Sequence, residues 1–285
     1  MAVQFVIRVT FLLLLTYGSA EAAAAPMANP NCRDRCGNVS IPYPFGIGGR
    51  CYMEKWFEVV CNRTADSPAK AFLASIDVEL LEIKIGDLTG IDSYSPYEPG
   101  IVRVNMPNIS SYCRRQLSGG VNMRGSPFYF SSYRNTFISV GCDHMAIMTG
   151  IDPVVTGCKS DCNNKSMTDQ KCSGFNCCQT AVPDGIQVLN VDFQSIKGDK
   201  ASGECKHAWI GEDKWLYSNK TKWSDYVQYL EYVPVVLEWI PTEGPRDRDS
   251  DWSTTSYDRD YYYCNRGFQG NPYLPTGCEG KLNLI

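Results

Sequence analysis

The chain has 285 residues, which is enough for one sizeable domain or two modest ones. Its net charge of −4 argues against nucleic-acid binding, because the molecule as a whole does not attract a polyanion. An anionic ligand would therefore have to be held by a local basic patch.

The N-terminus has the pattern of a secretory signal peptide over residues 1–22. Arg8 precedes an apolar run at 9–15, and small residues at 18–22 provide a cleavage site. An uncleaved anchor is the alternative, but the run is far shorter than the roughly 20 residues that span a bilayer. No later segment is long and apolar enough either. The sequence therefore predicts an exported mature chain that has no membrane span.

The remaining hydrophobic pattern is typical of short β-strands bounded by Gly, Pro and Asn. Apolar residues alternate at 102–106, 138–142 and 233–239, which predicts half-buried strands there. Pro234 lacks a backbone donor and places the third strand toward a sheet edge. The predicted fold class is all-β, or β-rich with short helices.

The apolar phase changes after Leu80 within residues 76–85. A β-bulge reconciles the two phases. The alternative is a helix that carries Leu73, Ile76, Leu80 and Ile83 on one face. The same shift recurs after Val188 in residues 186–193.

Fourteen cysteines in an exported chain indicate disulfides rather than metal ligands. Zinc is the alternative because two pairs have a Cys-x3-Cys spacing, but the chain has only two histidines. Neighbouring Cys177 and Cys178 lie too close together to bond each other comfortably, so we expect two different partners. Twelve cysteines can close among themselves and the last two on each other. The cysteines are Cys32, Cys36, Cys51, Cys61, Cys113, Cys142, Cys158, Cys162, Cys172, Cys177, Cys178, Cys205, Cys264 and Cys278.

Five Asn-x-Ser/Thr triplets support the same compartment and predict N-glycosylation. They begin at Asn38, Asn62, Asn108, Asn164 and Asn219.

The charged run at 246–251 predicts a solvated linker over residues 244–260. The alternative is a calcium loop with ligands at Asp247, Asp249, Asp251, Ser253, Thr255 and Asp258. That fit is poor because Trp252 stands where an EF-hand needs glycine and no helices flank the run. No metal or cofactor is predicted.

A series of motifs begins with Cys36-Gly37, continues with Ile-Pro-Tyr-Pro-Phe-Gly at 41–46, and reaches Cys51 and Cys61. Further motifs follow at 141–143 (Gly-Cys-Asp), 157–162 (Gly-Cys-x3-Cys), 174–180 (Gly-Phe-Asn-Cys-Cys-Gln-Thr), 205–209 (Cys-Lys-His-Ala-Trp) and 233–239 (Val-Pro-Val-Val-Leu-Glu-Trp). The series resembles the galacturonan-binding extracellular domain of plant wall-associated receptor kinases. On this resemblance we assign residues 23–243 to such a domain.

Residues 261–285 resemble the second half of the EGF-like module that follows in this family. The family's cysteine at position 262 is a tyrosine here, and no cysteine lies between Cys205 and Cys264. The resemblance implies a disulfide between Cys264 and Cys278. No kinase signature follows, so the family's signalling activity is not carried over.

The resemblance implies binding to pectin-type, galacturonate-rich polymers in the cell wall or apoplast, and no enzymatic activity. Arginine grips a planar carboxylate through two parallel hydrogen bonds. We expect ligand-binding residues in segments that the first four cysteines draw together, with tyrosines against sugar rings, and a second group beside Cys113. The candidates are Arg33, Arg35, Arg50, Arg63, Tyr43 and Tyr52, followed by Arg114 and Arg115 with Arg124 and Arg134 downstream.

Each candidate has a simpler interpretation. An arginine is most often an ordinary solvated charge, and the 41–46 motif is more often structural than functional. The sequence has no catalytic signature such as Gly-x-Ser-x-Gly, and His144 and His207 fit core or surface roles better. The second functional hypothesis is a secreted protein-interaction module, for example a decoy or co-receptor that pairs with a receptor-kinase ectodomain.

Overall fold

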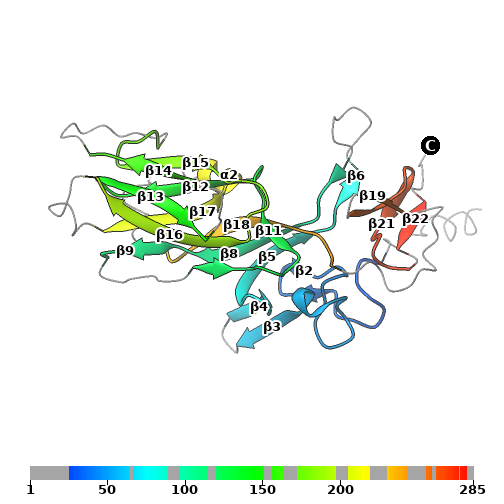
Figure 1. Ribbon diagram of the computed structural model, residues 1–285. Coiled ribbons are helices and arrows are strands. Elements are labelled where there is room, and N and C mark those ends of the chain that lie inside the picture. Colours follow the sequence, from blue (N-terminus) through cyan, green and yellow to red (C-terminus); the bar gives the residue numbers. More distant parts are fainter. Residues whose placement is uncertain are drawn as a thin grey trace, which may run out of the picture.

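The computed structural model describes residues 26–64, 67–88, 97–113, 120–150, 156–162, 172–196, 205–218, 230–242, 255–258, 261–275 and 277–280. The chain is built from β-strands, with one short α-helix and one 3-10 turn among the described residues (Figure 1). This confirms the all-β prediction. No helix within these ranges is long and apolar enough to cross a membrane. The expected signal peptide lies outside them.

Six antiparallel strands form the largest sheet, in the order β11-β18-β8-β5-β4-β3. Alternate side chains of β18 and β8 are fully buried because successive side chains point to opposite faces. The strands are β11 (Phe128–Phe130), β18 (Tyr232–Trp239), β8 (Ile101–Pro107), β5 (Val78–Lys84), β4 (Ser67–Leu73) and β3 (Val59–Thr64).

Two four-stranded sheets lie together at the left of Figure 1. The first has the order β15-β12-β17-β9, with β15 (Cys177–Ala181), β12 (Asn135–Val140), β17 (Lys206–Glu212) and β9 (Ile109–Ser111). The second has the order β10-β16-β13-β14, with β10 (Val121–Asn122), β16 (Val188–Ser195), β13 (His144–Thr149) and β14 (Thr156–Ser160). Helix α2 (Asp213–Ser218) directly follows β17.

The remaining elements are two-residue to four-residue strand pairs and the 3-10 turn η1 (Lys55–Phe57). The pairs are β1 (Arg35–Cys36) with β2 (Val39–Ser40), β6 (Asp87–Leu88) with β7 (Tyr97–Glu98), β19 (Thr255–Asp258) with β20 (Tyr261–Cys264), and β21 (Phe268–Gly270) with β22 (Cys278–Gly280). Strand β19 falls within the predicted linker, and the other residues of the linker lie outside the described ranges.

The predicted strands are present, and one phase shift has the predicted cause. The register between β5 and β8 shifts between Leu80 and Glu82, which confirms the β-bulge, and the helical alternative is wrong. The second phase shift has a different origin. The ladder between β16 and β13 runs without a shift, and Val188 and Leu189 pair instead with β10.

Two further strand predictions need qualification. Strand β12 is buried on both faces rather than half-buried, because Phe137, Ile138 and Ser139 are all inaccessible. Strand β18 lies between β8 and β11, but β11 covers only its last three residues. Pro234 therefore sits where β18 has one partner strand, as its missing backbone donor requires.

An aromatic cluster joins the N-terminal segment to the six-stranded sheet. Phe45 contacts Phe57 and Trp239 with ring centroids 5.0 and 5.5 Å apart, both in edge-to-face geometry. All three side chains are no more than 1% exposed. Ile41 and Phe45 are core residues, so the motif at 41–46 has the structural role that the sequence favoured.

The C-terminal segment packs onto the same core. The ring centroids of Tyr273 and Trp239 lie 5.2 Å apart, and Tyr273 is 2% exposed. The Asn271 side-chain amide donates hydrogen bonds to the carbonyl oxygens of Met27 at 2.7 Å and Tyr43 at 2.6 Å. Both ends of the described chain therefore meet at one place in the structure.

Candidate functional site

All fourteen cysteines form disulfides, with sequence separations from 5 to 92 residues. Cys177 bonds Cys172 and Cys178 bonds Cys158, so the two adjacent cysteines reach different partners as predicted. Cys264 bonds Cys278, as the family resemblance implied. The other pairs are Cys32–Cys51, Cys36–Cys61, Cys113–Cys205 and Cys142–Cys162.

The two N-terminal disulfides hold the four arginines of the first predicted group on a short, cross-linked stretch of backbone. Arg33 and Arg35 lie beside Cys32 and Cys36, and Arg50 and Arg63 lie beside their partners. The tight turn between β1 and β2 requires Gly37, because its φ is +57° and a Cβ atom would lie 2.2 Å from the Ala69 carbonyl oxygen.

All four guanidinium groups are exposed. Arg35 donates to the Asn38 carbonyl oxygen at 3.3 Å, and an Arg33 Nη atom lies 3.7 Å from Cys61 Sγ. Among the described residues, none of the four has a carboxylate within 4.0 Å. Each therefore keeps donors that are directed to solvent and that fit an external carboxylate.

The two predicted tyrosines are half-buried and pack against the core. The Lys55 ammonium lies 5.8 Å from the centre of the Tyr52 ring. That ammonium also pairs with Glu58, and this hydrogen bond raises the pKa of Lys55. A stacking role of Tyr43 and Tyr52 against sugar rings stays a prediction.

Only the downstream half of the second basic group lies within the described residues. Arg114 and Arg115 lie outside the described residues. Arg124 donates to the Gly150 carbonyl oxygen, and Arg134 lies 3.8 Å from a Glu98 carboxylate oxygen. The last two arginines therefore already have partners within the protein.

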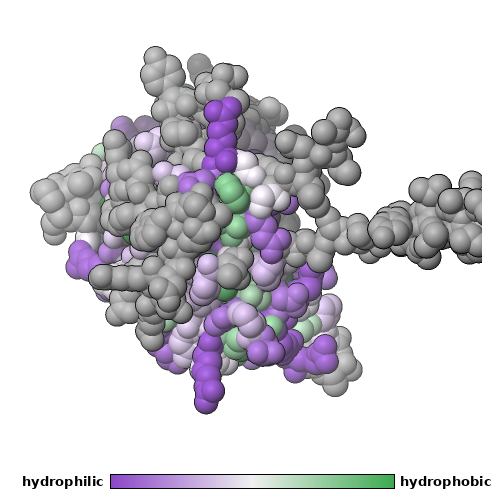
Figure 2. Space-filling model, turned by 90° about the vertical axis from the view of Figure 1, so that its right-hand side faces the viewer, coloured by the Kyte–Doolittle hydropathy of each residue, from purple (hydrophilic) through white to green (hydrophobic). Residues whose placement is uncertain are grey.

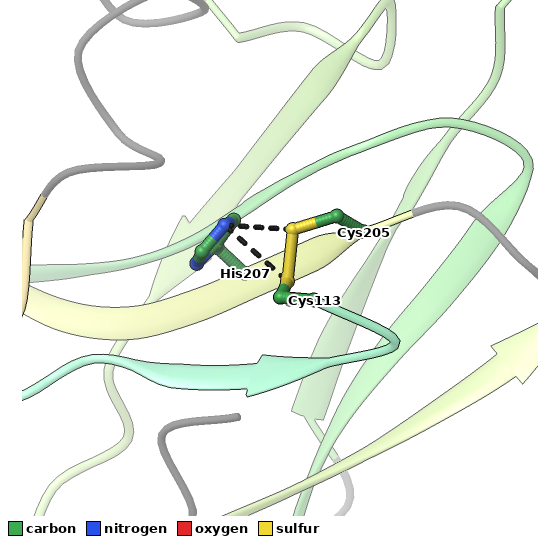
Figure 3. Close-up of side chains that lie close together, drawn as sticks. All are labelled: Cys113, Cys205 and His207. Atoms are coloured by element: carbon green, nitrogen blue, oxygen red, sulfur yellow. Dashed lines mark hydrogen bonds between the residues drawn. A yellow bond between two sulfur atoms is a disulfide. The ribbon is translucent and has the colours of Figure 1, made fainter. Parts of the chain in front are cut away.

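The Cys113–Cys205 disulfide and His207 form the only group of three potential metal-ligating side chains among the described residues. Figure 3 shows the imidazole facing the two sulfur atoms, with Nε2 3.1 Å from Cys205 Sγ and 3.6 Å from Cys113 Sγ. The two sulfurs are bonded to each other, so no thiolate is present to bind zinc. The predicted alternative of a calcium loop falls mainly outside the described residues.

Neither histidine is placed for catalysis in this structure. His144 is fully buried, and its Nε2 lies 2.7 Å from the hydroxyl of Ser139, which is also fully buried. Burial lowers the pKa of His144 to about 4. Burial also lowers the pKa of His207. This serine–histidine contact has no access to a substrate, so both histidines have the structural role that the sequence favoured.

One of the predicted glycosylation sites is wrong for the folded chain. Asn108 is 0% exposed, and its amide donates to the Leu230 carbonyl oxygen and to His207 Nδ1, both at 3.0 Å. A glycan on that nitrogen would replace one of its two N–H donors and has no room at a fully buried position. Asn38 and Asn62 are exposed, and Asn164 and Asn219 lie outside the described residues.

Sequence reasoning missed a groove of about 510 Å³ on the six-stranded sheet. Its lining includes Lys84 of β5, Tyr133 before β12, and Lys214 and Trp215 of α2. These residues come from segments far apart in the sequence, and no spacing rule connects them. Among these residues, Tyr133 stands out in the structure because its aromatic side chain is 85% exposed.

Comparison with known proteins gives two family matches. Residues 32–91 match the family described as wall-associated receptor kinase galacturonan-binding, and residues 169–245 match the family described as wall-associated kinase. The first match contains the four exposed arginines, and the second contains helix α2. No solved structure matches the chain.

Several curated relatives come from Arabidopsis thaliana. Wall-associated receptor kinase-like 3 is 32% identical over 311 residues, which cover 95% of this chain and 42% of the relative. Wall-associated receptor kinase-like 4 is also 32% identical, and the aligned region covers 95% of this chain and 40% of that relative. Wall-associated receptor kinase-like 6 is 30% identical, and the aligned region covers 87% of this chain and 44% of that relative. The chain thus spans about two fifths of the length of these relatives.

Proposed function

We propose that this chain, which matches two families of wall-associated receptor kinases, binds galacturonan of the plant cell wall through arginines on its N-terminal cross-linked loops. The observation that carries the proposal is the group of four exposed guanidinium groups within the galacturonan-binding match. None of them is neutralised by a carboxylate among the described residues. The proposed location is the extracellular wall.

The chemistry of the ligand agrees with these groups. Galacturonan carries a carboxylate on each sugar, and a guanidinium binds a carboxylate through two charge-assisted hydrogen bonds. The disulfides Cys32–Cys51 and Cys36–Cys61 fix the backbone that carries the arginines. A rigid backbone loses less conformational freedom on binding, which favours affinity.

The described surface on the side of the C-terminal strands β19, β21 and β22 is polar. Figure 2 shows that the described residues on the face at the right of Figure 1 are mainly hydrophilic, with small and separate hydrophobic spots. A broad apolar patch would instead favour a protein partner. We therefore place binding of a receptor-kinase ectodomain second, and we propose a binding role rather than an enzymatic one.

The test measures retention of the glycosylated, oxidised protein on immobilised polygalacturonate. We expect each of Arg33→Glu, Arg35→Glu, Arg50→Glu and Arg63→Glu to weaken binding about twofold to tenfold at low salt, with a larger loss for the combined variant. Retention of the unaltered chain should fall as salt rises, because exposed charges are screened over about 8 to 10 Å near physiological ionic strength.

The matched control is Lys159→Glu, which reverses one exposed charge on β14 in the distant four-stranded sheet. It should bind like the unaltered chain. If the combined arginine variant binds as well as this control, the arginines are not the contact surface. If the unaltered chain is not retained even at low salt, the proposed function itself is wrong.

A further inference from the structure

Two hollows lie one after the other on the face of the six-stranded sheet that is turned away from its core. The first is the groove of about 510 Å³ already described, and the second has a volume of about 460 Å³. Arg103 of β8 lines the first and Asn105 lines the second. These residues are two apart on one strand, so their side chains share a face and are about 7 Å apart along it.

The partner strand repeats this order. Glu82 pairs with Arg103 and lines the first hollow, and Glu79 pairs with Asn105 and lines the second. Each hollow also has one exposed tyrosine, with Tyr133 85% and Tyr232 58% accessible. We call this continuous surface the outer track and define it by Glu79, Glu82, Arg103, Asn105, Tyr133 and Tyr232.

The floor of the outer track is held by polar pairs. Arg103 Nε donates to Glu212 at 2.6 Å, and the Lys84 ammonium lies 3.2 Å from Glu82. Asn105 Nδ2 donates to Glu79 at 3.1 Å. These bonds fix the side chains before a ligand arrives while leaving further donors and acceptors for it.

The two ends of the outer track differ in charge. The first hollow is lined by four basic side chains, including Lys214 and Arg134, against three acidic ones. The second is lined by Asp77 and Glu79 and by no lysine or arginine. Most of these charges are paired: Lys70 lies 2.9 Å from Glu79, and Lys84, Arg103 and Arg134 each contact a carboxylate. Lys214 therefore gives the first end its positive character and Asp77 gives the second end its negative character. An anionic group is favoured at the first end and disfavoured at the second.

We infer that the outer track binds an extended pectic oligosaccharide, with an ionised uronate in the first hollow and an uncharged sugar unit, such as a methyl-esterified uronate, in the second. A long, shallow surface with hydroxyl-binding acids and amides between two exposed aromatic rings matches a sugar chain better than a compact ligand. The inference rests on the proposed function, because it takes the ligand to be a polyuronate. It adds a second contact surface and a preference for partial esterification.

The test compares two oligogalacturonides of equal length, one fully ionised and one partially methyl-esterified, in calorimetric titrations at low salt. Esterification also removes carboxylates that the four arginines would bind, so this comparison is made in the combined arginine variant. There we expect the esterified probe to bind about twofold to threefold more tightly, because it places no charge beside Asp77. Tyr133→Ala should weaken the binding of both probes about threefold to tenfold, through loss of ring stacking. Lys214→Glu should weaken the binding of both probes and make the loss of affinity with salt shallower, because it removes an attractive charge contact.

Two variants control for indirect effects. Asp77 has a positive φ of 52°, a conformation that asparagine also tolerates, so Asp77→Asn removes the charge without straining the turn. It should abolish the preference for the esterified probe. Tyr217→Ala removes an exposed tyrosine of helix α2, which also carries Lys214. Tyr217 does not line either hollow, so this variant should bind both probes like the unaltered chain.

The outcomes separate this inference from the proposed function. If Tyr133→Ala and Lys214→Glu bind like Tyr217→Ala while the arginine variants lose binding, the outer track is wrong and the proposed function stands. If Asp77→Asn keeps the preference for the esterified probe, the assignment of the second hollow is wrong. If the unaltered chain binds neither probe, both proposals fail.

Discussion

Two buried histidines lie within one hydrogen-bonded region of the core. Because the amide nitrogen of Asn108 only donates, His207 Nδ1 accepts and the ring proton sits on Nε2, facing the Cys113–Cys205 disulfide. His144 Nδ1 lies 3.3 Å from the Cys142 carbonyl oxygen, and Nε2 lies 2.7 Å from Ser139 Oγ, which also donates to the His207 carbonyl oxygen at 3.0 Å. Both rings are neutral in the fold, which makes the core sensitive to acid.

This arrangement predicts that stability falls as the pH is lowered. Burial holds the pKa of His144 at about 4, whereas the ordinary value is 6.5. Below pH 6.5 the unfolded chain takes up a proton that the fold excludes, so unfolding becomes easier until the pH reaches about 4. The loss for His144 is about 3 kcal/mol, and His207 adds to it in the same direction.

Chemical denaturation from about pH 7 to about pH 4 measures this loss. His144→Gln is the control, because glutamine can still hydrogen-bond with Ser139 but does not titrate. Its free energy of unfolding should depend less steeply on pH in this window. An unchanged slope would show that other groups dominate the acid response.

At the scale of elements, the adjacent cysteines Cys177 and Cys178 connect β15 in two ways. Cys158–Cys178 joins β15 to β14 of the other four-stranded sheet across a sequence separation of 20 residues. Cys172–Cys177 closes a local loop with a separation of 5 residues. A longer loop restricts the unfolded chain more, so the two bonds differ in their contribution.

We predict that the double variant Cys158→Ser with Cys178→Ser lowers the free energy of unfolding by about 3 kcal/mol. The matched double variant Cys172→Ser with Cys177→Ser should lose about 2 kcal/mol. Denaturant titration of the oxidised proteins measures both. A larger loss for the short loop would contradict the chain-entropy argument and indicate that local geometry dominates.

Sequence patterns predicted the features whose cause is local. Alternation along β8 and β18 and the phase change at Leu80 each reflect the two-residue period of a strand. Burial of both faces of β12 was not predictable, because it depends on which sheet packs onto the second face. The Asn108 triplet failed for the same reason, since a three-residue motif carries no information about burial.

The same distinction between local and long-range causes applies to the candidate site. The arginines beside Cys32, Cys36, Cys51 and Cys61 were identifiable because the disulfides join residues close in sequence. The outer track was not, because Lys84, Tyr133 and Lys214 meet only through strand order. Knowledge of the family helped with Cys264 and Cys278 and left the track unidentified.

At the scale of the whole molecule, the segment that follows the predicted linker is part of the main core. Trp239 of β18 contacts Phe45 from the N-terminal segment and Tyr273 from the C-terminal segment. The hydrogen bonds from Asn271 to Met27 and Tyr43 close the same contact with backbone partners. A segment too small to bury a core of its own is stabilised here by the rest of the chain.

This predicts that the C-terminal segment unfolds together with the main sheets. Tyr273→Ala should lower the free energy of unfolding by about 3 to 5 kcal/mol, because it leaves a cavity beside Trp239 and Tyr262. Scanning calorimetry should show one transition in both proteins, at lower temperature in the variant. Arg266→Ala, an exposed change in the same segment, is the control and should leave the transition in place. Two separate transitions in the unaltered chain would mean that the segment is an independent unit and that the aromatic contact contributes little to holding it.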